Sequence, residues 1–430
     1  MAKSGDGAKS GDGAKSGDGR RREIVPTITI PIGPIHPALK EPVNFRITVE
    51  GEEIVDVDVR SGYNHRGIEW LGLRRNWIQT LYLAERICGI CSWVHPFCYT
   101  QAAEDACNIE VPERADFIRV IIAELERIHS HLLWVGIAGY EIGYDTILHI
   151  TWQVREKILD LLEFLTGNRI NYGMGMIGGV RRDIEEKHIL KIDENLKYYK
   201  EAADQLINIG LHDKTIEKRM KNCGILPRKD ALELSILGPT TRGSGVRKDV
   251  RQDEGYAAYG DIGVKAVVPQ DILGSVTGDV FDRTVVRLVE LKQSVEIIEN
   301  ALDMMPSGPV MYEKKPLKLI KQMQKESGEG IGMHEAPRGE VIQYIRADAS
   351  DKPARWKIRS PTINNLLACR PMLLGDQIAD IPIVVASIDP CISCTDRVTI
   401  VERDEKRSKK KEVLFTMQEL RGRFKRKVFV

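Results

Sequence analysis

The pattern of hydrophobic and polar positions predicts long helices in the middle of the chain. Between about Pro112 and Pro306, apolar residues recur at alternating steps of three and four, which is the spacing of one helix face. The stripe is clearest over residues 121–135, 150–165, 189–206 and 288–302. We expect these stretches to pack as a helical bundle. A loop-rich insert with many glycines, residues 223–280, separates the third stretch from the fourth.

The segments on either side of the bundle have different patterns. Residues 45–49 and 55–59 alternate apolar with polar side chains around Gly51, which predicts a β-hairpin. Residues 381–388 are mostly apolar and predict a buried strand or core segment. The whole chain therefore predicts an α+β fold that is mostly α. It would have a central long-helix bundle, an N-terminal β-hairpin region and a mixed α/β C-terminal part.

The sequence divides into five segments. They are a repeat tail (1–22), the hairpin region (23–111), the bundle (112–306), the mixed C-terminal part (307–397) and a basic C-terminal tail (398–430). Residues 2–19 repeat Ala-Lys-Ser-Gly-Asp-Gly three times, and we expect disorder because such a segment cannot bury a core. The repeats are either an inert extension or a docking segment for an acidic partner. The basic tail is either a solvated surface or a contact for a partner subunit or lipid headgroups.

Composition narrows the classes of function. The 430 residues carry a net charge of +1, so no strong overall field favours nucleic acid. No secretory signal is visible. The hydrophobic share of 42% is ordinary for a soluble protein. No apolar run approaches the roughly 18 to 20 residues of a membrane span. If the protein works at a membrane, other chains must hold it there.

Four of the eight cysteines form two C-x-x-C pairs, Cys88 with Cys91 and Cys391 with Cys394. Four thiolates can bind zinc, an iron–sulfur cluster or nickel and iron. A zinc ribbon usually separates its pairs by about 15 to 20 residues, whereas about 300 residues separate these. Spacing alone leaves the choice of metal open. The other cysteines have no recurring spacing and are predicted to be small buried hydrophobes; they are Cys98, Cys107, Cys223 and Cys369.

The residues around the pairs carry a family resemblance. Arg-Ile-Cys-Gly-Ile-Cys-x-x-x-His at 86–95 and Asp-Pro-Cys-Ile-Ser-Cys-x-x-Arg at 389–397 resemble the nickel-binding signatures of [NiFe] hydrogenase large subunits. Further motifs resemble group 4, energy-converting membrane-bound hydrogenases and the homologous quinone-site (49 kDa-type) subunit of complex I. They are Ile-Gly-Pro-Ile-His-Pro (32–37), Asn-His-Arg-Gly-Ile-Glu (64–69), Glu-Arg-Ile-His-Ser-His (126–131), Gly-Gly-Val-Arg-Arg-Asp (178–183), Gly-Pro-Thr-Thr-Arg-Gly-Ser-Gly (238–245) and Glu-Ala-Pro-Arg-Gly (335–339). Complex I subunits lack the nickel thiolates, so all four cysteines favour hydrogen chemistry.

The resemblance implies a role for each thiol. Cys88 and Cys391 would bind nickel terminally. Cys91 and Cys394 would bridge nickel to an iron that carries CO and cyanide. The implied reaction is the reversible conversion of H₂ into two protons and two electrons. Cys391 would act as the first base.

Four further residues match positions of the family's active site, and each also has a purely structural interpretation. Glu41 matches a proton gate, or it is a surface glutamate in a turn. Arg338 matches an arginine held over the metals, or it forms a structural ion pair. Asp389 would orient Arg338 or the adjacent cysteine, or it caps a turn. His95 would donate to a bridging sulfur, or it is a packed core residue.

The resemblance also implies partners. They are a small Fe–S subunit, further Fe–S and integral membrane ion-translocating subunits, and ferredoxin. The chain would lie peripherally on the cytoplasmic side of the cell membrane. One departure is Arg397, which stands where many family members have a histidine. Two alternatives stay open: a complex I-like or sulfur-reducing oxidoreductase subunit, and a scaffold that holds structural zinc.

Overall fold

The computed structural model describes residues 26–395 and two strands in the predicted basic tail, Val398–Glu402 (β9) and Lys411–Phe415 (β10). These two strands pair antiparallel. The predicted repeat tail, residues 1–22, lies outside the described residues.

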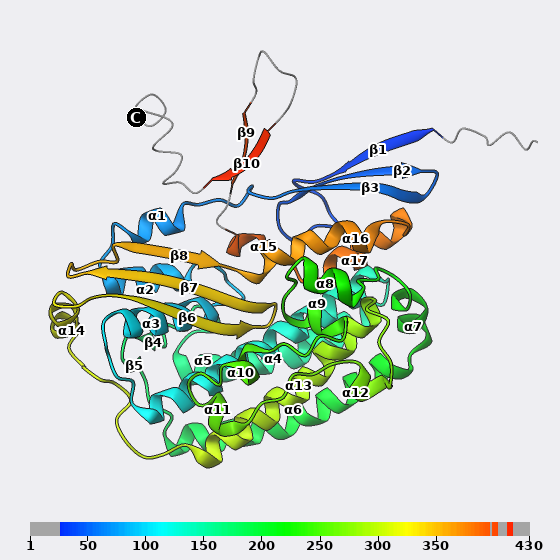
Figure 1. The fold of residues 1–430 in the computed structure, drawn as a ribbon. Helices are drawn as coiled ribbons and strands as arrows, with labels where there is room; N and C mark the ends of the chain where they lie inside the picture. The colour runs from blue at the N-terminus through cyan, green and yellow to red at the C-terminus, as the bar shows by residue number, and fades with distance from the viewer. Residues whose placement is uncertain (1–25, 396–397, 403–410, 416–430) are drawn as a thin grey trace, which may run out of the picture.

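The long helices lie where periodicity placed them. They are α4 (Glu113–Glu141), α5 (Asp145–Thr166), α6 (Glu186–His212) and α13 (Val280–Met304). Helix α4 packs against α5 and α13, and α13 also packs against α6 (Figure 1). Helix α4 is buried on almost every side, which makes it the central element of the bundle. The predicted helical bundle is therefore confirmed.

An N-terminal sheet lies on the opposite side of the molecule from α6 (Figure 1). It contains β1 (Thr27–Ile32), β2 (Asn44–Glu50) and β3 (Glu53–Arg60), all antiparallel in that order. The β2–β3 hairpin was predicted because its inward positions alternate, and their side chains are buried. Strand β1 was not predicted, because it is largely exposed and shows no clear alternation. The loop between β1 and β2 carries Glu41.

A second antiparallel sheet contains β6 (Ser327–Ala336), β7 (Gly339–Asp348) and β8 (Arg355–Arg359). Strand β6 lies directly on α3 (Val94–Ala106) (Figure 1). Glycines at alternate positions of β6 make this close approach possible. A Cβ atom at Gly332, for example, would lie 2.0 Å from the Cys98 carbonyl oxygen. The sheet is thereby fixed on the helix that follows the first cysteine pair.

The strand reading of residues 381–388 is wrong. The structure has helix α17 (Ile381–Ser387) there, although the segment is buried as expected. Pro382 stands in the first turn, where the missing N–H needs no partner and the fixed φ favours a helix. An apolar run of this length has no periodicity that separates a buried strand from a buried helix.

Short elements complete the fold, and the loop-rich insert contains several of them. They are α1 (Ile68–Gly72), α2 (Trp77–Glu85), β4 (Gly175–Met176), β5 (Gly179–Val180), α7 (Lys214–Met220), α8 (Arg228–Glu233), α9 (Gly238–Gly243), α10 (Val250–Asp253), α11 (Tyr259–Ile262), α12 (Gln270–Leu273), α14 (Pro316–Met323), α15 (Pro361–Asn365), η1 (Leu366–Ala368), α16 (Cys369–Leu373), η2 (Ile378–Asp380) and η3 (Ile392–Cys394). The predicted α+β, mostly α class is confirmed.

Within the described residues, every helix is too short or too polar to cross a bilayer.

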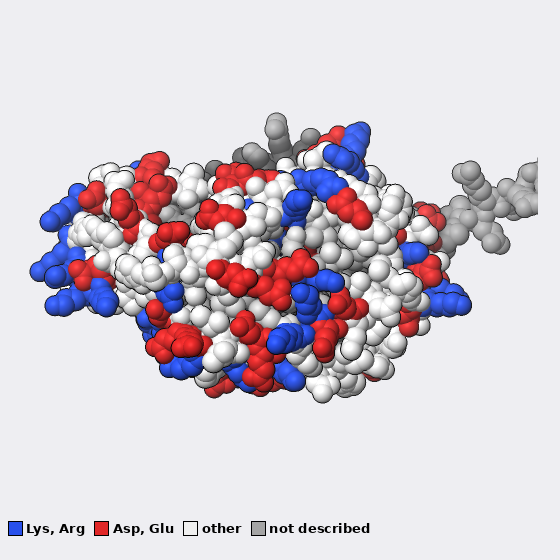
Figure 2. Space-filling model, turned by 90° about the horizontal axis from the view of Figure 1, so that it is seen from below, with Lys and Arg blue, Asp and Glu red and all other residues white. Residues whose placement is uncertain are grey.

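The surface fits the near-neutral net charge. Acidic and basic side chains are interspersed on the face seen in Figure 2. Mixed charges of this kind produce no strong field of one sign.

Candidate metal centre

Two loops bring the paired cysteines together in the core. Cys88 and Cys91 lie between α2 and α3, and Cys391 and Cys394 lie between α17 and the end of η3. Cys88 Sγ is 3.3 Å from Cys391 Sγ, which is 2.9 Å from Cys394 Sγ. The sulfurs of Cys88, Cys91 and Cys394 all lie within 4.8 Å of one another. All four thiols are buried and free of disulfide bonds.

This donor set fits the nickel–iron group that the sequence implies. Convergent thiolates are soft, electron-rich ligands that suit nickel and iron. The sulfurs come from loops 303 positions apart, so they meet only in the folded chain. The same four thiols also satisfy the ligand requirement of zinc. Geometry therefore defines a cluster of four thiols that could hold a metal ion, and it does not distinguish between these metals.

The first cysteine loop is stabilised by backbone groups and by α4. The amides of Ile90 and Cys91 both lie 3.3 Å from Cys88 Sγ. N–H groups directed at a sulfur favour its thiolate form. The carboxyl of Glu126 accepts from the amides of Trp93 (2.6 Å) and Val94 (3.2 Å). It thereby satisfies free amides at the start of α3.

Arg66 ties the two cysteine loops together. Its Nη1 donates to the Arg86 carbonyl (3.1 Å), and its Nη2 donates to the carbonyls of Ile87 and Ser393 (3.0 Å for Ser393). Asn64 Nδ2 donates to Ser393 Oγ (3.3 Å). Neither residue was predicted to have a role in the site. The signal was present, because both belong to the motif at residues 64–69.

Arg338 lies at the β6–β7 turn and reaches the cysteines. Its Nη1 is 3.4 Å from Cys91 Sγ and 3.2 Å from Ser130 Oγ. Its Nη2 donates to Asp389 Oδ1 (2.9 Å), and its Nε donates to the Asp389 carbonyl (3.0 Å). Burial disfavours the charged form, but Asp389 and the cysteine sulfurs outweigh burial and raise the pKa of Arg338. The guanidinium is therefore a fixed positive charge beside the thiols.

The Arg338 turn is held by backbone packing between two motifs. Gly238 has a positive φ of 67°, and a Cβ atom there would lie 2.4 Å from the Arg338 carbonyl oxygen. Asn365 Nδ2 donates to that same oxygen (3.3 Å) and to the Leu237 carbonyl (3.2 Å). The motifs at 238–245 and 335–339 thus meet backbone to backbone, which positions the guanidinium.

Asp389 adopts a strained backbone directly before the second cysteine pair. Its φ is +52°, in the left-handed region that few non-glycine residues occupy. One carboxylate oxygen accepts from Arg338, whereas the other, Oδ2, has no partner among the described residues. The structure thus places Asp389 in contact with Arg338. The next residues are also held from outside, because Thr362 Oγ1 accepts from the Cys391 amide (3.1 Å).

Glu41 lies against the loop of the second cysteine pair. Its carboxylate accepts from the amides of Ile392 and Ser393 (3.2 Å for Ser393) and from the Ser393 hydroxyl. It also lines a cavity of ≈ 150 Å³ that Arg338 and Cys391 border. The glutamate is therefore half-buried beside the thiols and not on the open surface.

His95 is the second residue of α3, and its ring reaches the second cysteine pair. Its Nε2 is 3.3 Å from Cys394 Sγ. Burial lowers the pKa of His95 to about 4, so the imidazole is neutral at pH 7. A neutral ring with the proton on Nε2 donates to sulfur. The remaining ring nitrogen, Nδ1, has no partner among the described residues.

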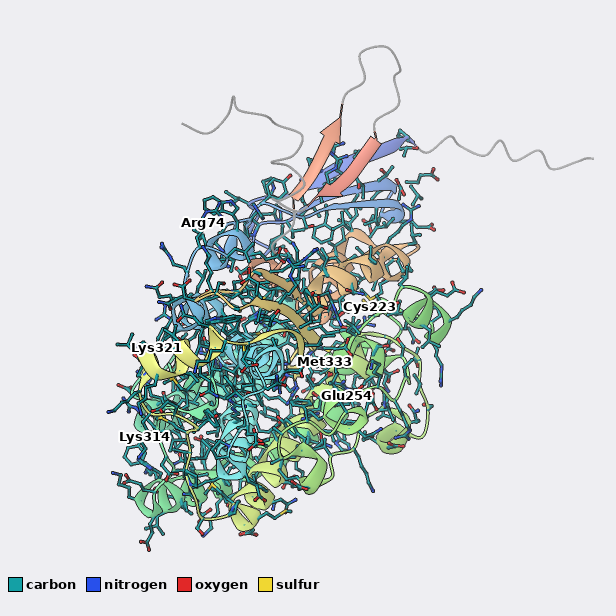
Figure 3. All side chains as sticks on the ribbon, turned by 60° about the vertical axis from the view of Figure 1, so that its left-hand side comes forward. Arg74, Cys223, Glu254, Lys314, Lys321 and Met333 are labelled. Carbon is teal, nitrogen blue, oxygen red and sulfur yellow. The ribbon has the colours of Figure 1, made fainter. Side chains whose placement is uncertain are left out.

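The other cysteines are buried away from these contacts. Cys98 Sγ lies 3.8 Å from the Val341 carbonyl, and Cys223, labelled in Figure 3, lies near helix α7. Burial raises the pKa of both thiols. They are neutral packing residues, in agreement with the interpretation from sequence.

Two protein-family models match the chain, and each covers one of the two cysteine pairs. The family described as "Respiratory-chain NADH dehydrogenase, 49 Kd subunit" matches residues 141–397, which include the second pair. The family described as "Nickel-dependent hydrogenase" matches residues 66–135, which include the first pair.

Individual relatives agree with the family models. The chain is 51% identical to the membrane-bound hydrogenase subunit alpha of Pyrococcus furiosus, over 88% of this chain and 90% of that protein. It is 36% identical to formate hydrogenlyase subunit 5 of Escherichia coli, over 88% of this chain and 65% of that protein. Among solved structures, a chain of the membrane-bound sulfane sulfur reductase, an archaeal respiratory membrane complex, has a TM-score of 0.80. That chain is 31% identical, and the match covers 86% of this chain and 98% of that one.

The fold and the four-thiol centre define a subunit of the class that unites nickel-dependent hydrogenases with the 49 kDa subunit of complex I. Within that class, the chain belongs to the family of large subunits of energy-converting, membrane-bound [NiFe] hydrogenases.

Proposed function

We propose that this chain is the catalytic subunit of a [NiFe] hydrogenase that interconverts H₂ with two protons and two electrons. The observation that carries the proposal is the convergence of four buried thiols under the Arg338 guanidinium. The relationship to membrane-bound hydrogenases supports the same reaction. The direct test is H₂ evolution by the intact complex, compared with that of a complex carrying Cys391→Ser.

The thiols would hold the metals in two roles. Cys88 and Cys391 would bind nickel, whereas Cys91 and Cys394 would be shared between nickel and an iron that carries CO and cyanide. When bound, this group supplies heterolytic cleavage of H₂. Arg338 offers a permanent positive charge beside Cys91, which favours charge separation in the reaction. His95 would donate to Cys394 and lower the electron density on that sulfur.

Protons would leave through Cys391 and Glu41. Cys391 is our choice for the first base, and Glu41 bonds the two residues that follow it, Ile392 and Ser393. A carboxylate so close to a thiol can relay its proton. Glu41 and Cys391 border the same cavity. Asp389 would keep Arg338 in place during these transfers.

Electrons would pass to other chains. We propose a small Fe–S subunit beside the cysteine loops, ferredoxin as the electron partner, and integral membrane subunits that couple electron flow to ion movement. The membrane-bound relatives support such an assembly. The chain would then lie peripherally on the cytoplasmic side of the membrane.

One observation favours a second candidate function, the reduction of sulfane sulfur. The similar solved chain belongs to a sulfane sulfur reductase. The two candidates separate in one assay, in which the intact complex receives reduced ferredoxin with and without polysulfide. H₂ formation that polysulfide does not suppress supports the hydrogenase. Sulfide formation without H₂ supports the reductase.

A further inference from the structure

A group of charged side chains is buried beside the turn that carries Arg338. Its carboxylates and guanidiniums come from α4, α13, β6 and the segment from α9 to α10. Each side chain is at most 1% exposed. Met333 and Glu254, labelled in Figure 3, mark the strand and the loop beside it. The members of this buried ionic cluster are Glu124, Arg127, Arg242, Asp249, Arg251, Glu290 and Glu335.

Each guanidinium in the cluster has a carboxylate as its main partner. The pairs are Arg251 with Asp249 (3.0 and 2.7 Å), Arg242 with Glu290 (2.9 and 2.8 Å) and Arg127 with Glu124 (3.1 Å). Four carboxylates therefore face three guanidiniums. Glu335 has to share the guanidinium of Arg242 with Glu290.

Glu335 and Asp249 crowd around a single nitrogen. Arg242 Nη1 is 2.7 Å from Glu335 Oε1 and 3.6 Å from Asp249 Oδ2. The second Glu335 oxygen accepts only from the Val250 amide (3.2 Å) among the described residues. The Arg242 nitrogen also donates to the Lys248 carbonyl (2.9 Å), so Asp249 adds negative charge there without a hydrogen bond from it. Two carboxylates around one nitrogen in a buried core cannot both ionise without a large free-energy cost. Asp249 keeps its charge because Arg251 binds both of its oxygens.

Among the remaining groups around the pair, the half-exposed Lys248 is a cation whose charge also acts on Glu335. These groups are Lys248, Arg287, His131, His334, Tyr256 and Tyr259. Lys248 is half-exposed and pairs with Glu340 and Asp253. Arg287 donates to the Ser387 carbonyl. Burial lowers the pKa of both histidines below 6.5, so both are neutral at pH 7.

We propose that Glu335 is a proton-binding site in the protein core, separate from the metal centre and physically joined to the Arg338 turn. The electrostatics agree: burial and the neighbouring Asp249 raise the pKa of Glu335 to about 7, although Arg242 opposes this. Burial also opposes ionisation of Asp249, but Arg251 and Arg242 lower its pKa to about 2. The proton therefore resides on Glu335.

The site is joined to Arg338 by the backbone. Glu335 stands three positions before Arg338 at the end of β6. Arg127 donates to the carbonyls of Glu335 and Ala336 (3.3 Å for Ala336), so the same arginine contacts the cluster and the turn. When Glu335 releases its proton, an uncompensated negative charge forms in the core beside this turn. Proton binding and the position of Arg338 are thereby linked.

The test is infrared difference spectroscopy of the intact complex, with spectra recorded below and above neutral pH. Glutamate labelled with ¹³C at the side-chain carboxyl identifies glutamic acid bands. The wild type should show a glutamic acid band that is present at the lower pH and absent at the higher pH. Glu335→Gln should abolish this difference band. Glu290→Gln is the matched control, because it removes a carboxylate of the same cluster that is ionised throughout.

Other carboxyl groups could also give infrared bands, and the label and the variants distinguish them from Glu335. Glu126 also has a raised pKa, and so do the aspartates Asp116, Asp282 and Asp376. The Glu126 band should survive in Glu335→Gln, and the aspartic acid bands do not shift with glutamate label. If Glu335→Gln does not fold, labelled Glu126→Gln decides, because a pH-dependent glutamic acid band that remains in it supports Glu335 and its absence overturns the proposal. A wild type without a pH-dependent glutamic acid band overturns the proposal, and so do pH-dependent glutamic acid bands that are identical in the wild type and in Glu335→Gln.

Discussion

Arg338 and Asp389 are joined by two hydrogen bonds, one to the carboxylate (2.9 Å) and one to the main-chain carbonyl (3.0 Å). The pair connects the β6–β7 turn to the residue that precedes Cys391. Both groups are almost fully buried. A planar guanidinium can make this double contact while a third nitrogen faces Cys91, which an ammonium group cannot reproduce.

Arg338→Lys should therefore retain the metals but lower kcat by about a hundredfold, because one preorganised charge and its geometry are lost. The measurement is turnover per bound nickel. Arg359→Lys is a control on the same sheet, where the arginine pairs with Glu340 away from the thiols. Equal losses in both variants would contradict a special role for Arg338.

Glu41→Gln should preserve the fold and the metals, since an amide oxygen can still accept from the Ile392 and Ser393 amides. It cannot relay a proton. We expect turnover to fall by about 10² to 10⁴. The exposed Glu50→Gln serves as control. Full turnover in Glu41→Gln would require another route for the proton.

Arg66→Met should weaken metal retention by about 10- to 100-fold, because the variant frees the two cysteine loops from each other. The measurement is loss of nickel to a chelator over time. Arg74→Met is the matched control: Arg74 stacks on Trp70 nearby and is labelled in Figure 3. Identical loss rates in both variants would show that Arg66 does not hold the loops.

Acid should destabilise the chain partly through His131. Burial lowers its folded-state pKa to about 4, from an ordinary value of 6.5. The unfolded chain therefore binds the proton first as the pH falls. The contribution of neutral His131 is complete above pH 6.5 and is lost towards pH 4, by about 1.4 kcal/mol per pH unit.

His131→Gln should flatten the acid limb of the stability curve in this window. The measurement is the denaturation midpoint of this subunit as a function of pH. The slope should fall relative to the wild type between pH 4 and 6.5 and match it above. An unchanged slope would show that His131 is protonated in the folded chain.

Much of the fold and centre could be predicted from the sequence, because periodicity and paired cysteines are local signals. The four long helices lie where their stripes indicated. Helix α17 and strand β1 were missed, because a short buried run and an exposed strand carry no distinctive pattern. The contact of Arg66 with Ser393 spans 327 positions. Such a contact exists only in three dimensions, as do the partners of Glu335.

The most direct test of the central claim is a metal analysis of the intact complex together with its infrared spectrum in the region of metal-bound CO and cyanide. We predict nickel, iron in excess of nickel because the Fe–S subunits would contribute to it, CO and cyanide bands, and the loss of the nickel and of these bands in Cys391→Ser. Cys98→Ala, which removes a buried thiol outside the centre, should leave metals and bands unchanged. Zinc or no metal in mature protein, without such bands, would contradict the hydrogenase and leave a complex I-like or zinc-bearing subunit.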